Sequence, residues 1–285
     1  MTIYQLLTRA TKVLLLTEVR SSFVAFLFSG RGDALSSICG ISPIGGGFMH
    51  IPDGYLGPQT YIPLYGVSVG FWAMAQRKLK KELSLKHVPY LAMAAAFSFL
   101  IQMFNIPVPG GTTGHAVGAG IIAILLGPWT AVLAVSVVLI IQAILFGDGG
   151  ITALGANCFN MAVVMPFVSY GVFQLAKGKS AGRVRLAISA FLSGYLGLLV
   201  AALFTAAEFG IQPLIATGAD NRPLYAPYPL SVAIPAMAIE HLLVFGVVEG
   251  LVTMLLLRYF LKHEHDLVYG LSGPSGPDNL ARKLP

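Results

Sequence analysis

The chain has 285 residues, a net charge of +6 and a composition that is 56% hydrophobic but only 11% charged. Soluble domains carry about 25% charged residues, so this chain has too little polar surface for water, which excludes a soluble enzyme and a disordered protein. Nucleic acid is not an expected partner, because Lys and Arg beside membrane spans set orientation in the bilayer. The composition predicts an all-α, polytopic transmembrane bundle.

The first 48 residues form an extension that does not fit a membrane span, because Glu18 and Arg20 interrupt its apolar stretch. It also lacks the clean apolar core and cleavage site of a signal peptide. Two explanations stay open: residues 1–48 are removed, or translation begins at Met49. Gly45-Gly46-Gly47 just before Met49 favours the later start, because glycine codons are guanine-rich, as ribosome-binding sites are.

Seven apolar stretches, nearly free of charged residues, follow Met49. A helix needs about 20 residues to cross a bilayer, and the third stretch is short, with only Gly127-Pro128 between it and the fourth. We predict a seven-helix membrane domain over residues 49–262 and a short tail over residues 263–285. The predicted spans are 59–76, 88–105, 115–129, 130–147, 156–176, 186–207 and 231–257.

Basic residues gather in alternate connections. Thirteen Lys and Arg residues lie in the first and fifth connections and in the tail, whereas the other connections hold Arg222 alone. Because short cytoplasmic segments carry the Lys/Arg excess, we expect these three segments in the cytoplasm. We expect the chain itself in the inner (plasma) membrane of the cell. The segment around residues 49–57 is then outside.

The residues from Met49 read Met-His-Ile-Pro-Asp-Gly, and a histidine second from a free terminus is a chelator. The α-amine, the His50 amide nitrogen and the His50 imidazole can bind one ion in fused rings, and the fourth position stays open. Ni²⁺ or Cu²⁺ prefers such tetragonal nitrogen sites, and proton loss makes capture pH-dependent. Asp53-Gly54 indicates a turn that holds this end. The alternative is an ordinary interfacial histidine.

The next exterior connection offers a fourth ligand, His115, which we expect to open the third span. Thr112 or Thr113 is expected to cap that helix. Small residues leave room for another backbone, such as a returning N-terminus, although they equally suit plain helix packing around a solvated His115. The glycines concerned recur at every fourth position, Gly110, Gly114 and Gly118.

Polar residues that follow could support the ligands. Asp148 adds negative charge on the side from which a cation arrives. Asn157 and Asn160 lie three apart on one helical face, and they can hydrogen-bond the ligating imidazoles or, alternatively, neighbouring helices. The supporting residues expected around the ligands are Asp53, Thr112, Thr113, Asp148, Asn157 and Asn160.

The last predicted span carries three ionisable residues, Glu240, His241 and Glu249, which are functional candidates because charge is costly inside a membrane. His241 and Glu249 lie eight apart on one face, and a structural salt link between helices is favoured over a coupling role. A metalloprotease is excluded because His-Glu-x-x-His is absent, and a hydrolase elbow, Gly-x-Ser-x-Gly, is absent as well. No catalytic residue is expected.

Four motifs in this order resemble the CbiM/NikM family, the metal-capturing membrane subunits of energy-coupling factor transporters for cobalt and nickel. They are Met-His-Ile-Pro-Asp-Gly from Met49, Pro-Gly-Gly-Thr-Thr-Gly-His up to His115, Leu-Leu-Gly-Pro-Trp up to Trp129, and Leu-Phe-Gly-Asp-Gly-Gly-Ile-Thr-Ala-Leu-Gly-Ala-Asn-Cys-Phe-Asn up to Asn160.

The resemblance implies a seven-helix subunit that binds Co²⁺ or Ni²⁺ in a square plane through Met49, His50 and His115, with the metal as cargo and no permanent cofactor. The extension over residues 1–48 departs from the family pattern, which needs a free amine on Met49. The resemblance also implies partners for ATP-driven import: a transmembrane coupling subunit, ATPase subunits and a small accessory membrane subunit.

Alternatives stay open beside this resemblance. The chain could be a substrate subunit of the same transporter class for an organic micronutrient, an intramembrane hydrolase or a structural scaffold. Gly178-Lys179-Ser180 lacks the glycine of a phosphate-binding loop five positions earlier, so ATP hydrolysis is expected in another chain. A site of amine and imidazole nitrogens serves both cobalt and nickel, and neighbouring cobalamin-synthesis genes would favour cobalt.

Overall fold

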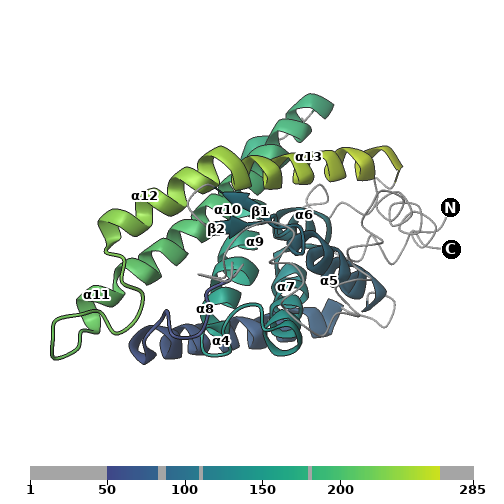
Figure 1. Ribbon diagram of the computed structural model, residues 1–285. Coiled ribbons are helices and arrows are strands. Elements are labelled where there is room, and N and C mark those ends of the chain that lie inside the picture. Colours follow the sequence, from purple (N-terminus) through teal and green to yellow (C-terminus); the bar gives the residue numbers. More distant parts are fainter. Residues whose placement is uncertain (1–49, 83–87, 109–111, 179–181, 264–285) are drawn as a thin grey trace, which may run out of the picture. The chain divides into compact units, whose positions relative to one another are not determined.

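The computed structural model describes residues 50–82, 88–108, 112–178 and 182–263 (Figure 1). All of them belong to one compact unit, Gly47–Pro285. The extension over residues 1–48, Met49, Gly110 and the tail beyond His263 lie outside the described residues.

The described residues form seven helical stretches, as the sequence predicts, and four of them are long and apolar enough to cross a membrane. Those four cover Pro128–Phe146, Leu154–Lys177, Arg183–Ile215 and Leu230–His263. The helices are α4 (Pro58–Glu82), α5 (Val88–Gln102), α6 (Ala119–Leu126), α7 (Pro128–Ile141) with η1 (Gln142–Phe146), α8 (Leu154–Asn157) with η2 (Cys158–Val164) and α9 (Met165–Lys177), α10 (Arg183–Gly210) with α11 (Gln212–Ile215), and α12 (Leu230–Glu240) with η3 (His241–Phe245) and α13 (Gly246–His263).

The third helix differs from its prediction, because α6 has eight residues and starts at Ala119 rather than at His115. The preceding residues form strand β2 (Thr112–Gly114), which pairs antiparallel with β1 (Ile106–Val108). Thr112 and Thr113 therefore lie in a strand and do not cap α6. The N-cap residue is Gly118, whose φ of +74° belongs to the left-handed region and separates the extended stretch from the helix.

Three of the long helical stretches contain a π-helical turn, at η1, η2 and η3. A π-turn adds a residue to the helical repeat, so side chains after it lie on a different face from the one that a 3.6-residue period predicts. The turn at η2 begins directly after Asn157. It therefore separates two asparagines, Asn157 and Asn160, that the sequence places together.

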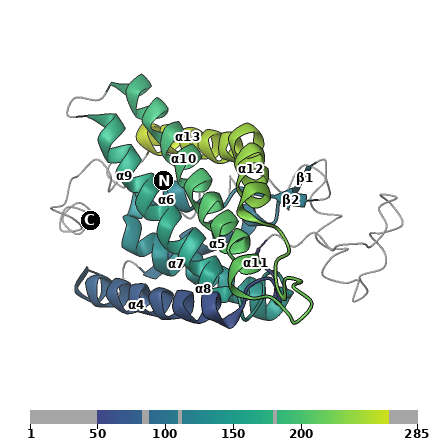
Figure 2. The same ribbon diagram turned by 90° about the vertical axis from the view of Figure 1, so that its left-hand side faces the viewer.

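Helix α10 lies beside α9, α12 and α13, as Figures 1 and 2 both show. Small residues permit this close packing in a membrane bundle. A Cβ atom on Gly194 of α10 would lie 2.6 Å from Thr253 Oγ1 and 2.8 Å from the carbonyl oxygen of Glu249, both on α13. The main chains of α10 and α13 are therefore in direct contact at Gly194.

Helix α4 packs along α7 and α8 on another side of the bundle (Figure 2). Trp72 Nε1 donates to Ser136 Oγ at 2.8 Å, and Ser68 Oγ donates to the carbonyl of Gly155 at 2.7 Å. In the first half of α4, the Tyr65 hydroxyl also donates to the carbonyl of Ile151, which places this part of the helix beside the 147–153 connection. The segment that precedes α4, residues 50–57, is thereby brought to the same place.

Candidate metal centre

The structure brings the two predicted imidazole ligands together. The ring centroids of His50 and His115 lie 5.1 Å apart, with an interplanar angle of 78°. Both residues are buried, with exposed fractions of 5% and 6%. Met49, the third predicted ligand residue, lies outside the described residues, among which no group of three or more His, Cys, Asp and Glu could hold a metal ion.

The His50 imidazole lies near a carboxylate but makes no hydrogen bond to a described residue. Asp148 Oδ2 lies 3.4 Å from His50 Nδ1, and no hydrogen bond joins these two atoms. Neither ring nitrogen has a hydrogen-bond partner in the described part of the chain. Buried polar groups are nearly always hydrogen-bonded, and an exception points to a functional role such as ligand binding. His50 can thus offer a ring nitrogen to a ligand.

The main chain beside His50 is held by Asn157. Asn157 Oδ1 accepts from the N–H of Ile51 at 3.0 Å, and Asn157 Nδ2 donates to the carbonyl of Ile51 at 3.1 Å. The N–H of Gly150 donates to the same carbonyl at 2.8 Å. The prediction that Asn157 bonds an imidazole is therefore wrong: its amide satisfies both main-chain groups of the residue after His50.

Two glycines of the 147–153 connection lie against the N-terminal segment. A Cβ atom on Gly149, where φ is +85°, would lie 3.0 Å from His50 Cβ, and one on Gly150 would lie 2.3 Å from the Asp53 nitrogen. Of the two alternatives left open for Gly110, Gly114 and Gly118, side-chain packing describes the latter two, because aromatic rings of Phe245 and Phe97 lie against Gly114 and Gly118. Gly110 lies outside the described residues. The two consecutive glycines at 149 and 150 are the sequence feature from which this close approach of the N-terminal segment could have been predicted.

Asp53 holds the turn after the predicted ligand. Its carboxylate accepts from the Thr152 N–H at 2.7 Å, the Thr152 hydroxyl at 2.5 Å and the Ile151 N–H at 3.2 Å. Partial burial raises the pKa of Asp53, but these three hydrogen bonds outweigh it, and the pKa is lowered from its ordinary value of 3.8. Asp53 therefore acts on the main chain of the facing connection.

The far end of the segment is held by Gln212, which the sequence analysis did not single out. Gln212 Oε1 accepts from the N–H of Gly57 at 2.9 Å, and Gln212 Nε2 donates to Thr60 Oγ1 at 2.9 Å. The N–H of Ala226 donates to the carbonyl of Tyr55 at 3.1 Å. Residues 50–57 are therefore fixed from two sides. A lone glutamine after a helix carries no sequence signal for this role.

Asn160 does not support an imidazole. Its Nδ2 donates to Glu208 Oε2 at 2.9 Å and to Thr205 Oγ1 at 3.0 Å, both on α10. These contacts agree with the alternative prediction, in which Asn160 forms hydrogen bonds to a neighbouring helix. The physical reason is the π-turn η2, which places Asn160 toward α10 while Asn157 faces Ile51.

For His241 and Glu249 the sequence favours a structural salt link to a neighbouring helix; that prediction is wrong among the described residues, because each side chain contacts main-chain atoms instead. His241 Nδ1 lies 2.8 Å from the carbonyl oxygen of Met237 in the same helix. The Glu249 carboxylate accepts from the N–H of Val117 at 2.8 Å and from the N–H of Gly118 at 3.1 Å. Glu249 thus contacts the connection that carries His115.

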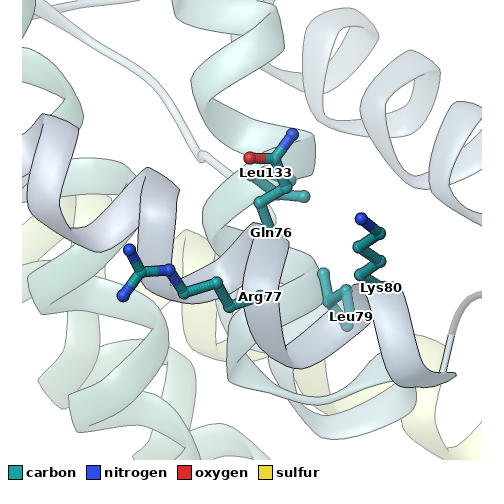
Figure 3. Close-up of a pocket in the computed structure, with 5 residues that line it drawn as sticks. All are labelled: Gln76, Arg77, Leu79, Lys80 and Leu133. Atoms are coloured by element: carbon teal, nitrogen blue, oxygen red, sulfur yellow. The ribbon is translucent and has the colours of Figure 1, made fainter.

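A groove of about 490 Å³ lies between α4 and α7 (Figure 3). Its lining contains none of the predicted ligands or supporting residues. Its cationic and amide side chains instead extend from the C-terminal half of α4, whose end is predicted to be cytoplasmic. The lining residues are Gln76, Arg77, Leu79, Lys80 and Leu133.

The sequence and the arrangement of helices have counterparts among known proteins. A family model named CbiM, described as a cobalt uptake substrate-specific transmembrane region, matches residues 50–267. The chain belongs to the CbiM family. This CbiM-family chain is therefore a multi-pass membrane component of a transport system and not an enzyme, as the sequence predicts.

Individual relatives cover most of this CbiM-family chain. The fused nickel transport protein NikMN of Rhodobacter capsulatus is 52% identical over 235 residues, which are 82% of this chain and 68% of that protein. A putative metal transport protein of Methanocaldococcus jannaschii is 48% identical over 220 residues, 77% of this chain and 94% of its own. A crystal structure of a truncated transition metal transporter has a TM-score of 0.72 and 49% identity, and it covers 76% of this chain and 100% of that one.

Proposed function

We propose that this CbiM-family chain captures Co²⁺ or Ni²⁺ for import, with four nitrogen ligands. These are the α-amine of Met49, the amide nitrogen and imidazole of His50, and the imidazole of His115. The observation that carries the proposal is the 5.1 Å separation of two buried imidazole rings that come from distant parts of the chain.

The ring separation favours a particular arrangement. With metal–nitrogen bonds of about 2 Å, two imidazoles in adjacent positions of a square plane have centroids roughly 4.5 Å apart, and in opposite positions roughly 6 Å apart. The observed 5.1 Å is nearer to the adjacent arrangement. The fused chelate of Met49 and His50 leaves one position of the plane open, and that position is adjacent to the His50 ring. A small inward shift of His115 then fills it.

Selectivity follows from this donor set. Ni²⁺ accepts a tetragonal arrangement of nitrogen ligands, and Co²⁺ binds the same donors, whereas Zn²⁺ favours a tetrahedron. Mg²⁺ requires an octahedron of oxygen ligands. Asp148, 3.4 Å from the His50 ring, adds negative charge that attracts a cation to the site.

The proposal requires a mature N-terminus at Met49. A peptide bond to residue 48 would convert the amine into an amide and remove one ligand of the chelate. We therefore propose that residues 1–48 are absent from the mature protein, either because translation begins at Met49 or because the extension is removed.

Import is proposed to proceed from outside to inside, within an energy-coupling factor complex of the ABC type. The one-sided distribution of Lys and Arg supports an exterior position for residues 49–57. The fused nickel transport protein of Rhodobacter capsulatus supports association with further transport components. The proposed partners are a coupling subunit, ATPase subunits and a small accessory membrane subunit.

The decisive experiment measures Ni²⁺ and Co²⁺ binding by titration calorimetry. It uses the full chain after N-terminal sequencing, together with protein that starts at Met49. We expect His50→Ala and His115→Ala each to weaken binding by at least 100-fold, because each removes a ligand. One glycine added before Met49 should do the same, since it displaces the amine. His263→Ala, an exposed histidine, is the control. Unchanged affinity in both ligand variants would favour the organic-micronutrient alternative.

A further inference from the structure

Glu249 has a position that metal capture by itself does not explain. Its carboxylate is wholly buried in α13 and faces the start of α6, close to His115 in sequence. We propose that Glu249 is a positioning residue that holds His115 in place for metal binding and links the α10–α13 pair to the site. This inference rests on the proposed function of His115.

The contact itself is a carboxylate bridge to two successive main-chain groups. Glu249 Oε2 accepts from the N–H of Val117 at 2.8 Å, and both carboxylate oxygens lie 3.1 Å from the nitrogen of Gly118. The first N–H groups of a helix have no partner within the helix and carry partial positive charge. The N-cap residue Gly118 has no side chain to satisfy them. Glu249 supplies that cap from another helix.

The bridge fixes the main chain two residues from the His115 ring. Ala116, the residue between His115 and the bridged Val117, is 4% exposed and Val117 is 1% exposed, so the connection has little freedom to move. Gly118 has φ of +74° and would otherwise be the most deformable point of this connection. A binding site loses affinity when its ligands depart by more than about 0.5 Å from the productive geometry. Release of Val117 and Gly118 would permit such a departure.

The carboxylate is in turn placed by the contact between α10 and α13. A Cβ atom on Gly194 would lie 2.8 Å from the carbonyl oxygen of Glu249, and one on Gly250 would lie 2.8 Å from the carbonyl oxygen of Phe191. Neither helix can shift along the other without moving Glu249. A movement of the pair relative to α6 therefore breaks the bridge and frees His115, which gives a route from helix movement to metal release.

The proposal is tested with Glu249→Gln in the purified protein with its mature N-terminus. Glutamine replaces one acceptor oxygen by an NH2 group. Because both carboxylate oxygens lie 3.1 Å from the nitrogen of Gly118, that group faces a main-chain donor whichever oxygen it replaces. Loss of a residue that orients a ligand typically weakens metal binding about 10- to 100-fold. We expect a Ni²⁺ affinity reduced within that range, and a visible absorption spectrum of bound Ni²⁺ shifted toward that of His115→Ala.

A double variant separates positioning from general stability. If Glu249 acts through His115, then Glu249→Gln combined with His115→Ala binds Ni²⁺ no more weakly than His115→Ala alone, because residues in one pathway are not additive. Thr253→Val is the matched control. It lies one turn further along α13, is equally buried, and its hydroxyl has no hydrogen-bond partner among the described residues. We expect the control to keep the wild-type spectrum and affinity.

The proposal is overturned if Glu249→Gln has the wild-type spectrum and affinity, or if its loss adds to that of His115→Ala. Should Glu249→Gln not fold, hydrogen exchange in the wild-type protein provides the test. The amides of Val117 and Gly118 should exchange far more slowly than the amides of the exposed Asp220–Arg222 turn, and equal rates would contradict the bridge. These failures differ from failure of the metal site itself, in which His115→Ala leaves Ni²⁺ affinity unchanged.

Discussion

Asn157 holds Ile51 by both of its main-chain groups, with Oδ1 accepting at 3.0 Å and Nδ2 donating at 3.1 Å. This pairing imitates one rung of a β-ladder, with a side-chain amide in place of a second strand. It fixes the residue directly after His50 before any metal arrives. The N-terminal ligand is therefore organised in advance, which lowers the entropic cost of binding an ion.

Asn157→Asp tests this pairing. The carboxylate still accepts from the Ile51 N–H, but it places an oxygen against the Ile51 carbonyl, which loses a donor. We expect Ni²⁺ affinity to fall about tenfold, as for other residues that orient metal ligands, and calorimetry measures it. Asn160→Ser is the control, because the Asn160 amide donates to Thr205 and Glu208 of α10 and not to the segment that carries His50. Equal losses in both variants would indicate general destabilisation and contradict the specific role.

Gly150→Ala should displace the N-terminal segment. The added Cβ would lie 2.3 Å from the Asp53 nitrogen and 2.7 Å from the Pro52 carbonyl carbon, so main-chain atoms must move. Overpacking of this kind typically costs about 1–3 kcal/mol, and we expect lower thermal stability together with weaker Ni²⁺ binding. Gly66→Ala is the control, since nothing lies within 4 Å of its Cβ position. A variant at Gly150 that binds as wild type would refute the close approach.

Asp53 gives a pH dependence with a defined sign. Its pKa in the folded protein is lowered from 3.8, so its ionised form stabilises the fold. That stabilisation is fully present above the unfolded value and disappears as the pH falls through the lower folded value. We expect the thermal stability difference between wild type and Asp53→Asn to be largest at neutral pH and to shrink once the pH falls below 3.8. A difference that grows on acidification would show that the sign is wrong.

The proposed orientation can be checked by labelling. Cysteines introduced in place of Arg222 and Lys80, both exposed, should react from opposite sides of the membrane. In intact cells we expect a membrane-impermeant maleimide to label Arg222→Cys, and to label Lys80→Cys only after permeabilisation. Cys158 is buried and serves as internal background. Labelling of Lys80→Cys in intact cells would reverse the orientation.

Local patterns in the sequence were sufficient for the helices and for the pair of histidines. Long apolar stretches predict helices whatever their neighbours. The bilayer core offers main-chain N–H and C=O groups no hydrogen-bond partners, so each segment must form its hydrogen bonds internally. The start at Met49-His50 and the loop motif ending at His115 each place nitrogen ligands within a few consecutive residues. These motifs were therefore sufficient to predict one shared ion. The third stretch, predicted over 115–129, begins too early because the left-handed Gly118 separates the extended residues that follow the hairpin from α6.

The supporting contacts depended instead on which distant groups meet in space. Asn157 and Asn160 share a face in an ideal helix, but the π-turn after Asn157 sends one to Ile51 and the other to Glu208. Glu249 finds main-chain N–H groups more than a hundred residues earlier in the chain. The periodicity of the sequence does not predict such contacts. They depend on which polar groups from distant segments become neighbours once the helices have packed.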